Sequence, residues 1–378
     1  MASRWVEIGS GKDKARAYVA VPKAGSGPGL LLFYADAGFS EDTRRLADLY
    51  AAEGYAVLAP EDRGDAPPDR VVAALKSLPE MDGKAGALGF GEGGTRALEA
   101  LAGGLVDCAV VYYGEGLEAV LDRPGAIDRP AVFHLSADDE SAAGLRARLR
   151  AEFPSGEVET YIYMARAGFA EPAGGAYDKS ATRVAYSRSL ALLRRVLGPR
   201  YDLDTIWDRH TELEFLTRDA ETTMTTMVAE PYVNHVPVMT GGTGYAETLR
   251  FYKHHFIPTA PKDSRLVPIS RTIGADRVVD EMLFCFTHDI EIDWMLPGVR
   301  PTGKAVEIPL VAIVQFRGDK IFSEHIYWDQ ASVLVQIGVL DRKLYPVAGI
   351  ETARKATDEY EPSNTLMARW KESERAAG

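Results

Sequence analysis

Cysteine is scarce in this sequence, and it contains no long apolar run. The two cysteines, Cys108 and Cys285, stand far apart and lack the close spacing of a metal site, so we predict no disulfide and a reducing, cytoplasmic location. No uninterrupted apolar stretch approaches the roughly 20 residues of a membrane-spanning helix. The first residues also lack the apolar core of a signal peptide. We therefore expect a cytoplasmic protein with no membrane partner.

The chain also has no excess of positive charge. The chain has 43 lysines and arginines against 55 aspartates and glutamates, a formal net charge of −12. Such a surface repels phosphate groups, so nucleic acid and anionic membranes are not expected as partners. Hydrophobic residues make up 46% and charged residues 26%, which is usual for a globular protein. At 378 residues the chain is longer than most domains that fold around a single hydrophobic core, so two domains are expected.

A nucleophile is missing from the most distinctive motif of the first half. The segment 88–94 (LGFGEGG) follows an apolar strand and precedes a helix at 95–102. This is the layout of a nucleophile elbow, G-x-Nu-x-G, in which a sharp turn raises a Ser or Cys above an α/β sheet. The central position here is Gly91, which has no attacking atom. The backbone N–H groups at Gly91 and Glu92 could still bind an anion or oxyanion, although a purely structural turn is the simpler explanation.

Strands and helices alternate through the first half. Helical periodicity predicts helices at 42–53, 95–102 and 182–196. Short apolar or alternating runs predict strands at 15–22, 29–34, 55–59, 85–89, 108–113 and 131–135. This alternation predicts an α/β domain with a doubly wound, mostly parallel sheet, whose ligand site lies at the carboxyl ends of the strands. The elbow falls at that edge.

Several segments, in this order, resemble the dienelactone hydrolase family, which has the α/β-hydrolase fold. They are the elbow, residues 106–116 (VDCAVVYYGEG), residues 129–135 (RPAVFHL) and residues 165–168 (ARAG), and the likeness covers about residues 5–197. That family hydrolyses lactones with a Cys, an Asp and a His. By this resemblance the nucleophile falls on Gly91 and the histidine on Phe169. The acid falls on Asp139 or, alternatively, on Asp138.

The resemblance therefore implies a catalytically degenerate domain. Gly91 offers no nucleophile, and Phe169 has no nitrogen to accept or return a proton. A family glutamate after the second strand corresponds to Asp36, which, like Glu92, is a candidate base for activating a water molecule. Residual lactone or ester hydrolysis through such a water is one alternative function for the chain.

The first domain is expected to end near Gly198-Pro199, directly after the helix at 182–196, because Gly at a helix end followed by Pro is a stop signal. We predict one domain at 1–198 and a second at 199–378, which includes a C-terminal tail. In the second, a helix at 202–228 and a helix ending at 256 precede strands at 277–288, 306–317 and 321–329. Helices followed by antiparallel strands predict an α+β fold.

The second half resembles the NTF2-like superfamily and, within it, the SnoaL-like polyketide cyclases. The matching segments are 234–237 (NHVP), 318–321 (GDKI), 324–330 (EHIYWDQ) and 334–338 (LVQIG), and the likeness covers about residues 200–345. It implies a cone formed by a curved antiparallel sheet and helices, with an apolar pocket that holds a few polar groups. In SnoaL-like cyclases an acid at the position of Asp329 acts as general acid/base beside a polar side chain, which here is Gln315.

Alternation along the last strand divides its side chains between two faces. One face carries Ser323, His325, Tyr327 and Asp329, and the other carries Glu324, Ile326 and Trp328.

The first of these faces is predicted to line the pocket. Asp329 would be the acid/base, and His325, Tyr327, His235 and Gln315 would orient the substrate. His325 and Tyr327 could equally form hydrogen bonds across the sheet. A carboxyl group in an apolar cone has a raised pKa, which suits proton transfer next to a carbonyl.

The expected function is cofactor-free cyclisation, isomerisation or hydration of a small-to-medium apolar carbonyl compound. No metal is expected, since no spacing requires one, although His235, His288, His325 and Asp329 form a conceivable set. A non-catalytic metabolite-binding protein is the alternative from another class. The resemblance to NTF2-like domains also implies a homodimer that pairs through its sheets.

Overall fold

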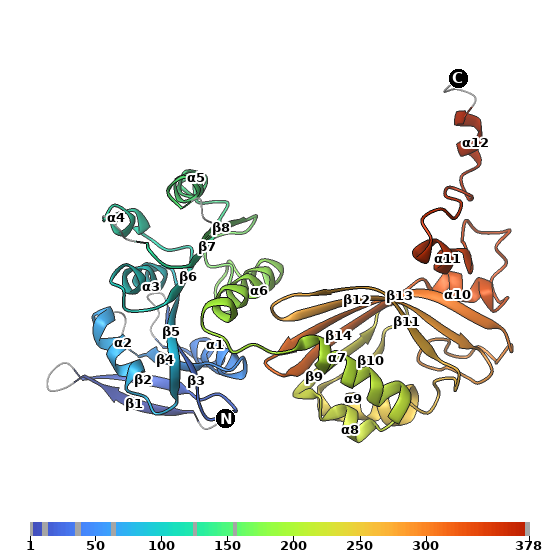
Figure 1. The fold of residues 1–378 in the computed structure, drawn as a ribbon, viewed down its shortest axis with the longest axis horizontal. Coiled ribbons are helices and arrows are strands. Elements are labelled where there is room, and N and C mark those ends of the chain that lie inside the picture. The colour runs from blue at the N-terminus through green and yellow to red at the C-terminus, as the bar shows by residue number, and fades with distance from the viewer. Residues whose placement is uncertain are drawn as a thin grey trace. The chain divides into compact units, whose positions relative to one another are not determined.

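The computed structural model of the chain describes residues 3–9, 14–34, 39–61, 66–123, 127–153 and 157–374. Asp36, one of the candidate bases, lies outside these ranges. The chain divides into two compact units, Met1–Tyr201 and Asp202–Gly378 (Figure 1). Across the described ranges, no helix combines the length and apolar character needed to cross a bilayer.

The first unit is built on an eight-stranded sheet. Its strands are β1 (Arg4–Ile8), β2 (Ala15–Ala20), β3 (Gly27–Phe33), β4 (Ala56–Pro60), β5 (Met81–Phe90), β6 (Cys108–Tyr112), β7 (Ala131–Ser136) and β8 (Val158–Tyr163). They are arranged in the order β1-β2-β4-β3-β5-β6-β7-β8. Strand β2 runs antiparallel to both of its neighbours, and the pairs from β4 to β8 are all parallel. The predicted doubly wound, mostly parallel α/β sheet is confirmed for this unit.

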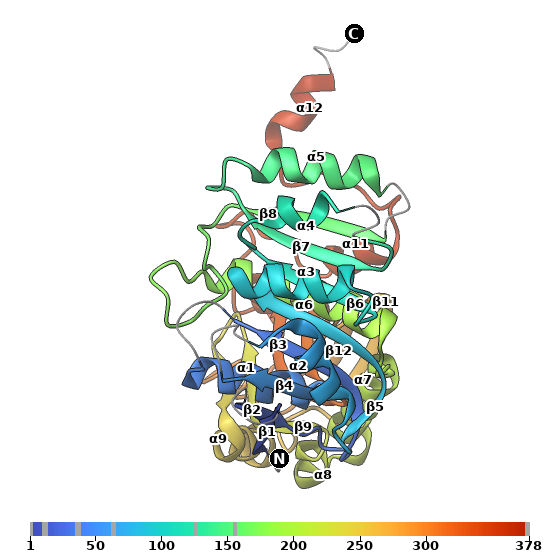
Figure 2. The same ribbon diagram turned by 90° about the vertical axis from the view of Figure 1, so that its left-hand side faces the viewer.

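Helices cover both faces of this sheet. They are α1 (Glu41–Ala52), α2 (Pro68–Lys76), α3 (Glu92–Ala102), α4 (Leu117–Leu121), α5 (Ala142–Glu152) and α6 (Lys179–Val196). Helices α2, α3, α4 and α5 lie on one face and α1 and α6 on the other (Figure 1), and Figure 2 shows α3 and α5 in front of the sheet. Because β4 and β6 are covered on both sides, every residue in them is buried, and they read as continuous apolar runs.

The second unit is built on a six-stranded sheet. Its strands are β9 (Met227–His235), β10 (Thr240–Thr243), β11 (Arg265–Ile273), β12 (Arg277–Thr287), β13 (Ala305–Arg317) and β14 (Lys320–Trp328). Their order is β10-β9-β14-β13-β12-β11, and only the β14–β9 pair is parallel. Long hairpins therefore connect β11 through β14, as the predicted run of antiparallel strands requires.

Helices and π-helical turns pack against the sheet of the second unit. On one face lie α7 (Leu203–Glu212), the π-helical turn η2 (Leu213–Thr217), α8 (Ala220–Met224), α9 (Gly244–Phe251) and the π-helical turn η3 (Tyr252–Phe256) (Figure 1). Three further helices follow the last strand: α10 (Gln330–Gln336), α11 (Glu351–Thr357) and α12 (Ala368–Glu374). Contacts with β13 anchor α10 and α11 to the sheet.

The prediction of one continuous helix at 202–228 is wrong. Helix α7 gives way to η2, and Arg218 adopts a left-handed conformation with φ 56° that ends the helical path. The side chain of Asp219 then accepts a hydrogen bond from the Thr222 N–H and caps a separate short helix, α8. The chain enters strand β9 at Met227, inside the range predicted to be helical.

Candidate functional site

The elbow of the first unit keeps its sharp turn. Gly91 lies between β5 and α3 at φ 53° and ψ −127°, a conformation that side chains other than glycine rarely adopt. Its backbone N–H donates to the Tyr112 carbonyl at 3.0 Å. That N–H is therefore engaged in the fold and does not face a ligand, contrary to the suggested anion site at Gly91. Glu92 is exposed in the first turn of α3.

Aromatic side chains surround Phe169, the position to which the resemblance assigns the family histidine. Phe169 is fully buried, and its ring centroid lies 4.9 Å from that of Tyr163 and 5.3 Å from that of Tyr113. Such packing fills the space beside the elbow with hydrocarbon. Of the two candidate acids, the exposed Asp139 accepts hydrogen bonds from its neighbour Ser141.

Asp138, in contrast, accepts a hydrogen bond from the Ala167 N–H at 3.2 Å and thus reaches the loop that carries Phe169. The Ser136 hydroxyl, together with this N–H, lowers the pKa of Asp138. Asp138, the alternative candidate, is thus the acid that contacts this loop. Phe169 itself offers no imidazole for it to orient.

A Ser–His pair does occur in this unit, but it belongs to the core. His134 Nε2 lies 2.9 Å from Ser189 Oγ, and its Nδ1 lies 2.9 Å from the Tyr163 hydroxyl. The Ser189 hydroxyl donates to the Ala185 carbonyl at 2.9 Å. Both His134 and Ser189 are completely buried, and burial lowers the pKa of His134 to about 3. This neutral, enclosed pair holds α6 against the sheet and is inaccessible to a substrate.

A cavity of about 40 Å³ lies between the sheet and the helices of the second unit. This space corresponds to about three water molecules. Most of its wall is apolar or aromatic, and the apolar lining includes Phe215, Phe256, Met282, Phe284, Leu310 and Ile326. The polar side chains in the wall are those of Thr211, Glu214, His235, Tyr252 and Glu324, with the indoles of Trp207 and Trp294.

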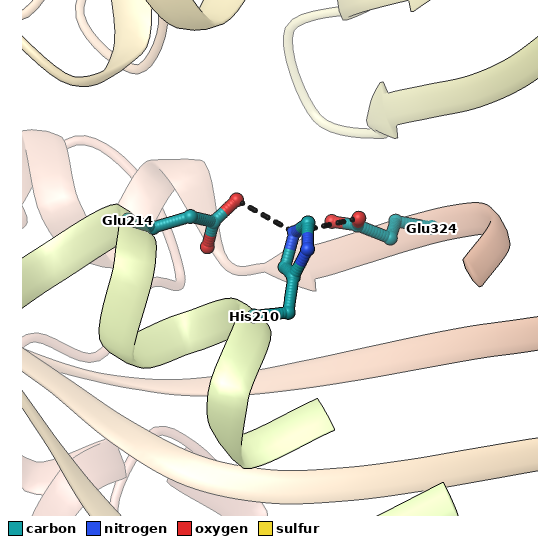
Figure 3. Close-up of side chains that lie close together, drawn as sticks. All are labelled: His210, Glu214 and Glu324. Atoms are coloured by element: carbon teal, nitrogen blue, oxygen red, sulfur yellow. Dashed lines mark hydrogen bonds and ion pairs between the residues drawn. The ribbon is translucent and has the colours of Figure 1, made fainter. Parts of the chain in front are cut away.

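Two of the lining carboxylates meet one imidazole (Figure 3). His210 Nε2 lies 3.1 Å from Glu214 Oε1 and 3.1 Å from Glu324 Oε1. The Tyr252 hydroxyl lies 3.3 Å from the same nitrogen and donates to Glu324 Oε1 at 3.3 Å. All four side chains are buried, with at most 4% of any residue exposed. His210 stands behind the carboxylates and is not part of the cavity wall.

Local structure explains how these groups converge. His210 and Glu214 are four residues apart, one turn along the path from α7 into η2, so their side chains point the same way. Tyr252 is the first residue of η3, and π-helical turns are frequent at functional sites. Glu324 projects from the middle of β14, on the same face as Ile326.

The hydrogen bonds around His210 determine where its protons lie. Thr226 Oγ1 donates to the Thr223 carbonyl at 2.6 Å, so at 2.6 Å from His210 Nδ1 it must act as acceptor. Nδ1 therefore carries a hydrogen. A bare Nε2 would place a lone pair against two carboxylates, so a proton on Nε2 is favoured and the ring is an imidazolium. Burial by itself lowers the pKa of His210, but Glu214 and Glu324 outweigh it and raise the pKa to about 10.

The cluster as a whole carries an unbalanced negative charge. One imidazolium with two carboxylates leaves a net charge of −1 in a buried site, which favours uptake of a further proton. Burial, assisted by the charge of Glu324, raises the pKa of Glu214. The same two causes, burial and the neighbouring carboxylates, raise the pKa of Tyr252 far above its usual value, so its hydroxyl stays protonated. The site thus combines a stored proton with a carboxylate able to accept one.

The structure places Asp329 elsewhere, and its predicted role in the pocket is wrong. Strand β14 ends at Trp328, and Asp329 is the exposed N-cap of α10. Its carboxylate accepts from the Ala331 N–H at 3.0 Å and from the Ser332 hydroxyl at 2.6 Å. The predicted strand was one residue too long, because Asp329 belongs to a helix cap and does not continue the alternation of β14.

The other predicted residues are divided between the two sides of the sheet. His325 packs against Tyr232 with ring centroids 5.5 Å apart, and Tyr327 is 40% exposed, so both lie on the face away from the cavity. Gln315 donates to Asp276 at 3.1 Å and does not line the cavity either. These placements contradict the predicted orienting roles of all three. His235 does line the cavity.

The sequence analysis missed His210 and Glu214 and placed Glu324 on the face opposite the pocket. A usable signal was present along α7 and into η2, where the buried positions Leu203, Trp207, His210 and Glu214 follow helical spacing. Two titratable residues within an apolar stripe require buried partners, and that requirement points to a site.

The same three side chains are also the ones to consider for a metal. The possible ligand atoms of His210, Glu214 and Glu324 lie within 4.8 Å of one another. Within the part of the chain that the structure describes, the set suggested from the sequence does not come together in this way: His235, His288, His325 and Asp329. Nitrogen and carboxylate donors suit a divalent transition metal. In the structure, however, these atoms satisfy one another through hydrogen bonds, which requires only a proton.

The strand order and the elbow of the first unit define an α/β-hydrolase-like domain, and the second unit is a sheet-rich domain with an internal cavity. Residues 61–197 match the dienelactone hydrolase family. The N-terminal part of the chain therefore carries a domain of that family.

Curated relatives agree with this match. Carboxymethylenebutenolidase 1 of Cupriavidus pinatubonensis is 32% identical over 126 residues, which is 33% of this chain and 54% of the relative. A carboxymethylenebutenolidase of a Pseudomonas species is 32% identical over 127 residues, 33% of this chain and 53% of the relative. The chain thus spans about half the length of the curated relatives it matches. A solved dienelactone hydrolase-like promiscuous phosphotriesterase from metagenomic libraries is 21% identical with a TM-score of 0.45, covering 52% of this chain and 99% of that one.

Proposed function

We propose that the cavity of the second unit catalyses cofactor-free proton transfer on a small-to-medium apolar carbonyl compound, giving isomerisation, cyclisation or hydration. The observation that carries this proposal is a pair of carboxylates, those of Glu214 and Glu324, in the wall of an apolar cavity. Each has an oxygen 3.1 Å from the same nitrogen, Nε2 of His210. The resemblance of the second half to SnoaL-like cyclases supports the reaction class. In this proposal the dienelactone hydrolase domain is catalytically degenerate.

Each polar group of the cluster has a distinct part in the proposed reaction. Glu324 accepts a proton from the carbon next to the substrate carbonyl, and the C–H electron pair moves into an enolate. Tyr252 turns its hydroxyl from Glu324 to the enolate oxygen and stabilises the developing charge. Glu214, whose pKa burial raises, takes the proton of His210 Nε2 and returns it to a carbon or oxygen of the intermediate, and the proton that Glu324 has accepted then restores the imidazolium. His210 is a positioning residue that holds both carboxylates and redistributes protons between them.

The cavity also limits the kind of substrate. Its net negative charge and apolar wall disfavour anions and favour neutral, largely apolar molecules. The space is small, so a single-ring compound is the largest suitable probe, and its binding requires side chains of the wall to move apart. These features also separate the proposal from a purely binding function, because a binding cavity for an apolar metabolite would gain nothing from two buried carboxylates that cost desolvation energy.

Deuterium exchange tests the proposal without knowledge of the natural product. The full chain is incubated in D₂O with acetophenone derivatives, and mass spectrometry follows deuterium entering the acetyl methyl group. We expect Glu324→Gln to reduce the exchange rate about 100-fold or more, since loss of a general base costs about 10²–10⁴-fold. Asp329→Asn is the matched control and should exchange like the wild type. Equal rates in wild type and Glu324→Gln would reject the assignment of the base.

Lactone hydrolysis is the second candidate, and the family match of residues 61–197 favours it. It requires a nucleophile or an activated water near Gly91, where the family cysteine is absent. Assay of a dienelactone with wild type and with Glu324→Gln separates the two functions. Hydrolysis that persists unchanged in Glu324→Gln would assign the activity to the first unit.

A further inference from the structure

Two buried polar atoms in the cavity wall have no hydrogen-bond partner. They are Nδ1 of His235 and Nε1 of Trp294, in residues that are 4% and 3% exposed. Both residues line the cavity that Glu214 and Glu324 also line. Buried polar atoms in folded proteins are nearly always paired, so two orphan atoms on neighbouring rings point to a ligand group that pairs with them.

The two atoms differ in hydrogen-bonding character. The indole N–H of Trp294 can only donate. Burial lowers the pKa of His235 to about 4, although the charge of Glu324 acts in the opposite direction, so the ring is neutral at pH 7. A neutral imidazole carries its one hydrogen on either nitrogen, so the unpaired Nδ1 donates in one tautomer and accepts in the other.

The rings cannot satisfy each other. The centroids of His235 and Trp294 lie 4.9 Å apart with the rings tilted by 40°, and neither nitrogen has the other as a hydrogen-bond partner. Phe256 lies against both, with centroids 5.5 Å from His235 and 4.8 Å from Trp294. The two orphan atoms are therefore set in an aromatic wall that suits a flat, apolar ring.

We propose that His235 Nδ1 and Trp294 Nε1 form a subsite for a hydroxyl group on the substrate, a proposal that rests on the proposed function of the cavity. A hydroxyl donates one hydrogen bond and accepts others, so it can pair with Nδ1 in either tautomer of the ring while it accepts from Nε1–H. A carbonyl or an ether has no hydrogen to donate, so it could pair with Nδ1 in only one tautomer. The substrate class is thereby narrowed to flat hydroxy-carbonyl compounds, such as hydroxyaryl ketones.

The sheet register indicates the spacing of the two groups on such a substrate. In the β9–β14 pair, Val233 lies opposite Glu324 and His235 lies opposite Ile326. His235 is thus two strand positions beyond the neighbour of Glu324, about 6.6 Å along the strand and about 4.8 Å across it. The Cα atoms of His235 and Glu324 are thus about 8 Å apart, which is about the length of one substituted benzene ring.

Paired ligands test the subsite on the full chain. Isothermal titration calorimetry compares 4-hydroxyacetophenone with 4-methylacetophenone, which has nearly the same shape but no hydroxyl. We expect wild type to bind the hydroxyl compound about tenfold more tightly. Trp294→Phe removes the indole N–H and His235→Phe removes Nδ1, and each should reduce the preference to about twofold or less. Equal binding of the two compounds by wild type would refute the subsite and leave water as its occupant.

A second measurement does not depend on the variants folding. In the ¹H–¹⁵N spectrum of wild type, the Trp294 indole signal should move downfield with 4-hydroxyacetophenone and not with the methyl compound. If the chemical shift of the Trp294 indole N–H changes equally with both compounds, the proposal would also be refuted.

The experiment separates this inference from the proposed function. Glu324→Gln should keep the hydroxyl preference while losing deuterium exchange. Exchange without a hydroxyl preference would reject only the subsite, and a preference without exchange would reject only the proton-transfer reaction.

Discussion

Replacing His210 with Gln would leave two buried carboxylates without the positive charge they share. In the wild type, the His210 imidazolium lies 3.1 Å from both Glu214 and Glu324, and none of the three is more than 4% exposed. Removing one partner of a buried ion pair costs about 3–5 kcal/mol, because the remaining charge stays desolvated. We expect His210→Gln to destabilise the second unit by that amount at pH 8.

The matched control is Glu214→Gln. This change removes one carboxylate but keeps the ion pair between His210 and Glu324, so the net charge of the cluster falls from −1 to zero. The glutamine carbonyl can still accept from Nε2–H. We expect its cost to stay within about 1 kcal/mol, as for exchange of one hydrogen bond for another. The large difference between two substitutions at neighbouring positions follows only if His210 is charged.

The effect also depends on pH in a defined direction. The pKa of His210 is raised to about 10 in the folded state, above the usual 6.5 of the unfolded chain. Stability from the charged imidazole is therefore complete below about pH 6.5 and is lost as pH rises toward about 10. The unfolding free energy of wild type should fall across this window, and that of His210→Gln should fall less.

Urea unfolding followed by tryptophan fluorescence is a suitable assay. Four of the five tryptophans belong to the second unit, namely Trp207, Trp294, Trp328 and Trp370, so the signal reports mainly on that unit. If His210→Gln proved no more costly than Glu214→Gln at pH 8, the ring would have to be neutral. The protonation states assigned to His210, Glu214 and Glu324 would then be wrong.

Three further substitutions test other parts of the molecule. Asp329→Asn should leave both exchange activity and stability within about 0.5 kcal/mol of wild type, because Asn caps helices as well as Asp does; a loss of activity would restore the role first predicted for this residue. Glu53→Gln should destabilise the first unit by about 3–5 kcal/mol in calorimetry, since it removes the buried partner of Arg194 at 2.6 Å. Gly91→Cys combined with Phe169→His should create lactone hydrolysis that wild type lacks, and measurable turnover by wild type would show that the first unit is active.

Much of the first unit could be predicted because its signals are local. Strands β4 and β6 are buried along their whole length, so they read as apolar runs without any knowledge of their neighbours. The spacing of glycines around Gly91 marks a strand-turn-helix element by backbone geometry alone. The absence of a nucleophile at 91 and of an imidazole at 169 is a fact of composition that no folding can alter.

The site of the second unit required the tertiary structure. Period-two alternation correctly placed Glu324, Ile326 and Trp328 together, but an alternating pattern does not say which face is inside. Helix α7 and the turn η2 decide that question, because they place His210 and Glu214 on the side where Glu324 emerges. The sequence by itself determined which residues share a strand face, where the elbow turns and that positions 91 and 169 carry neither a nucleophile nor an imidazole. Only the packing of α7 and the π-helical turns onto the sheet determined that two distant carboxylates share one proton-carrying imidazole, because charges converge through space and not along the chain.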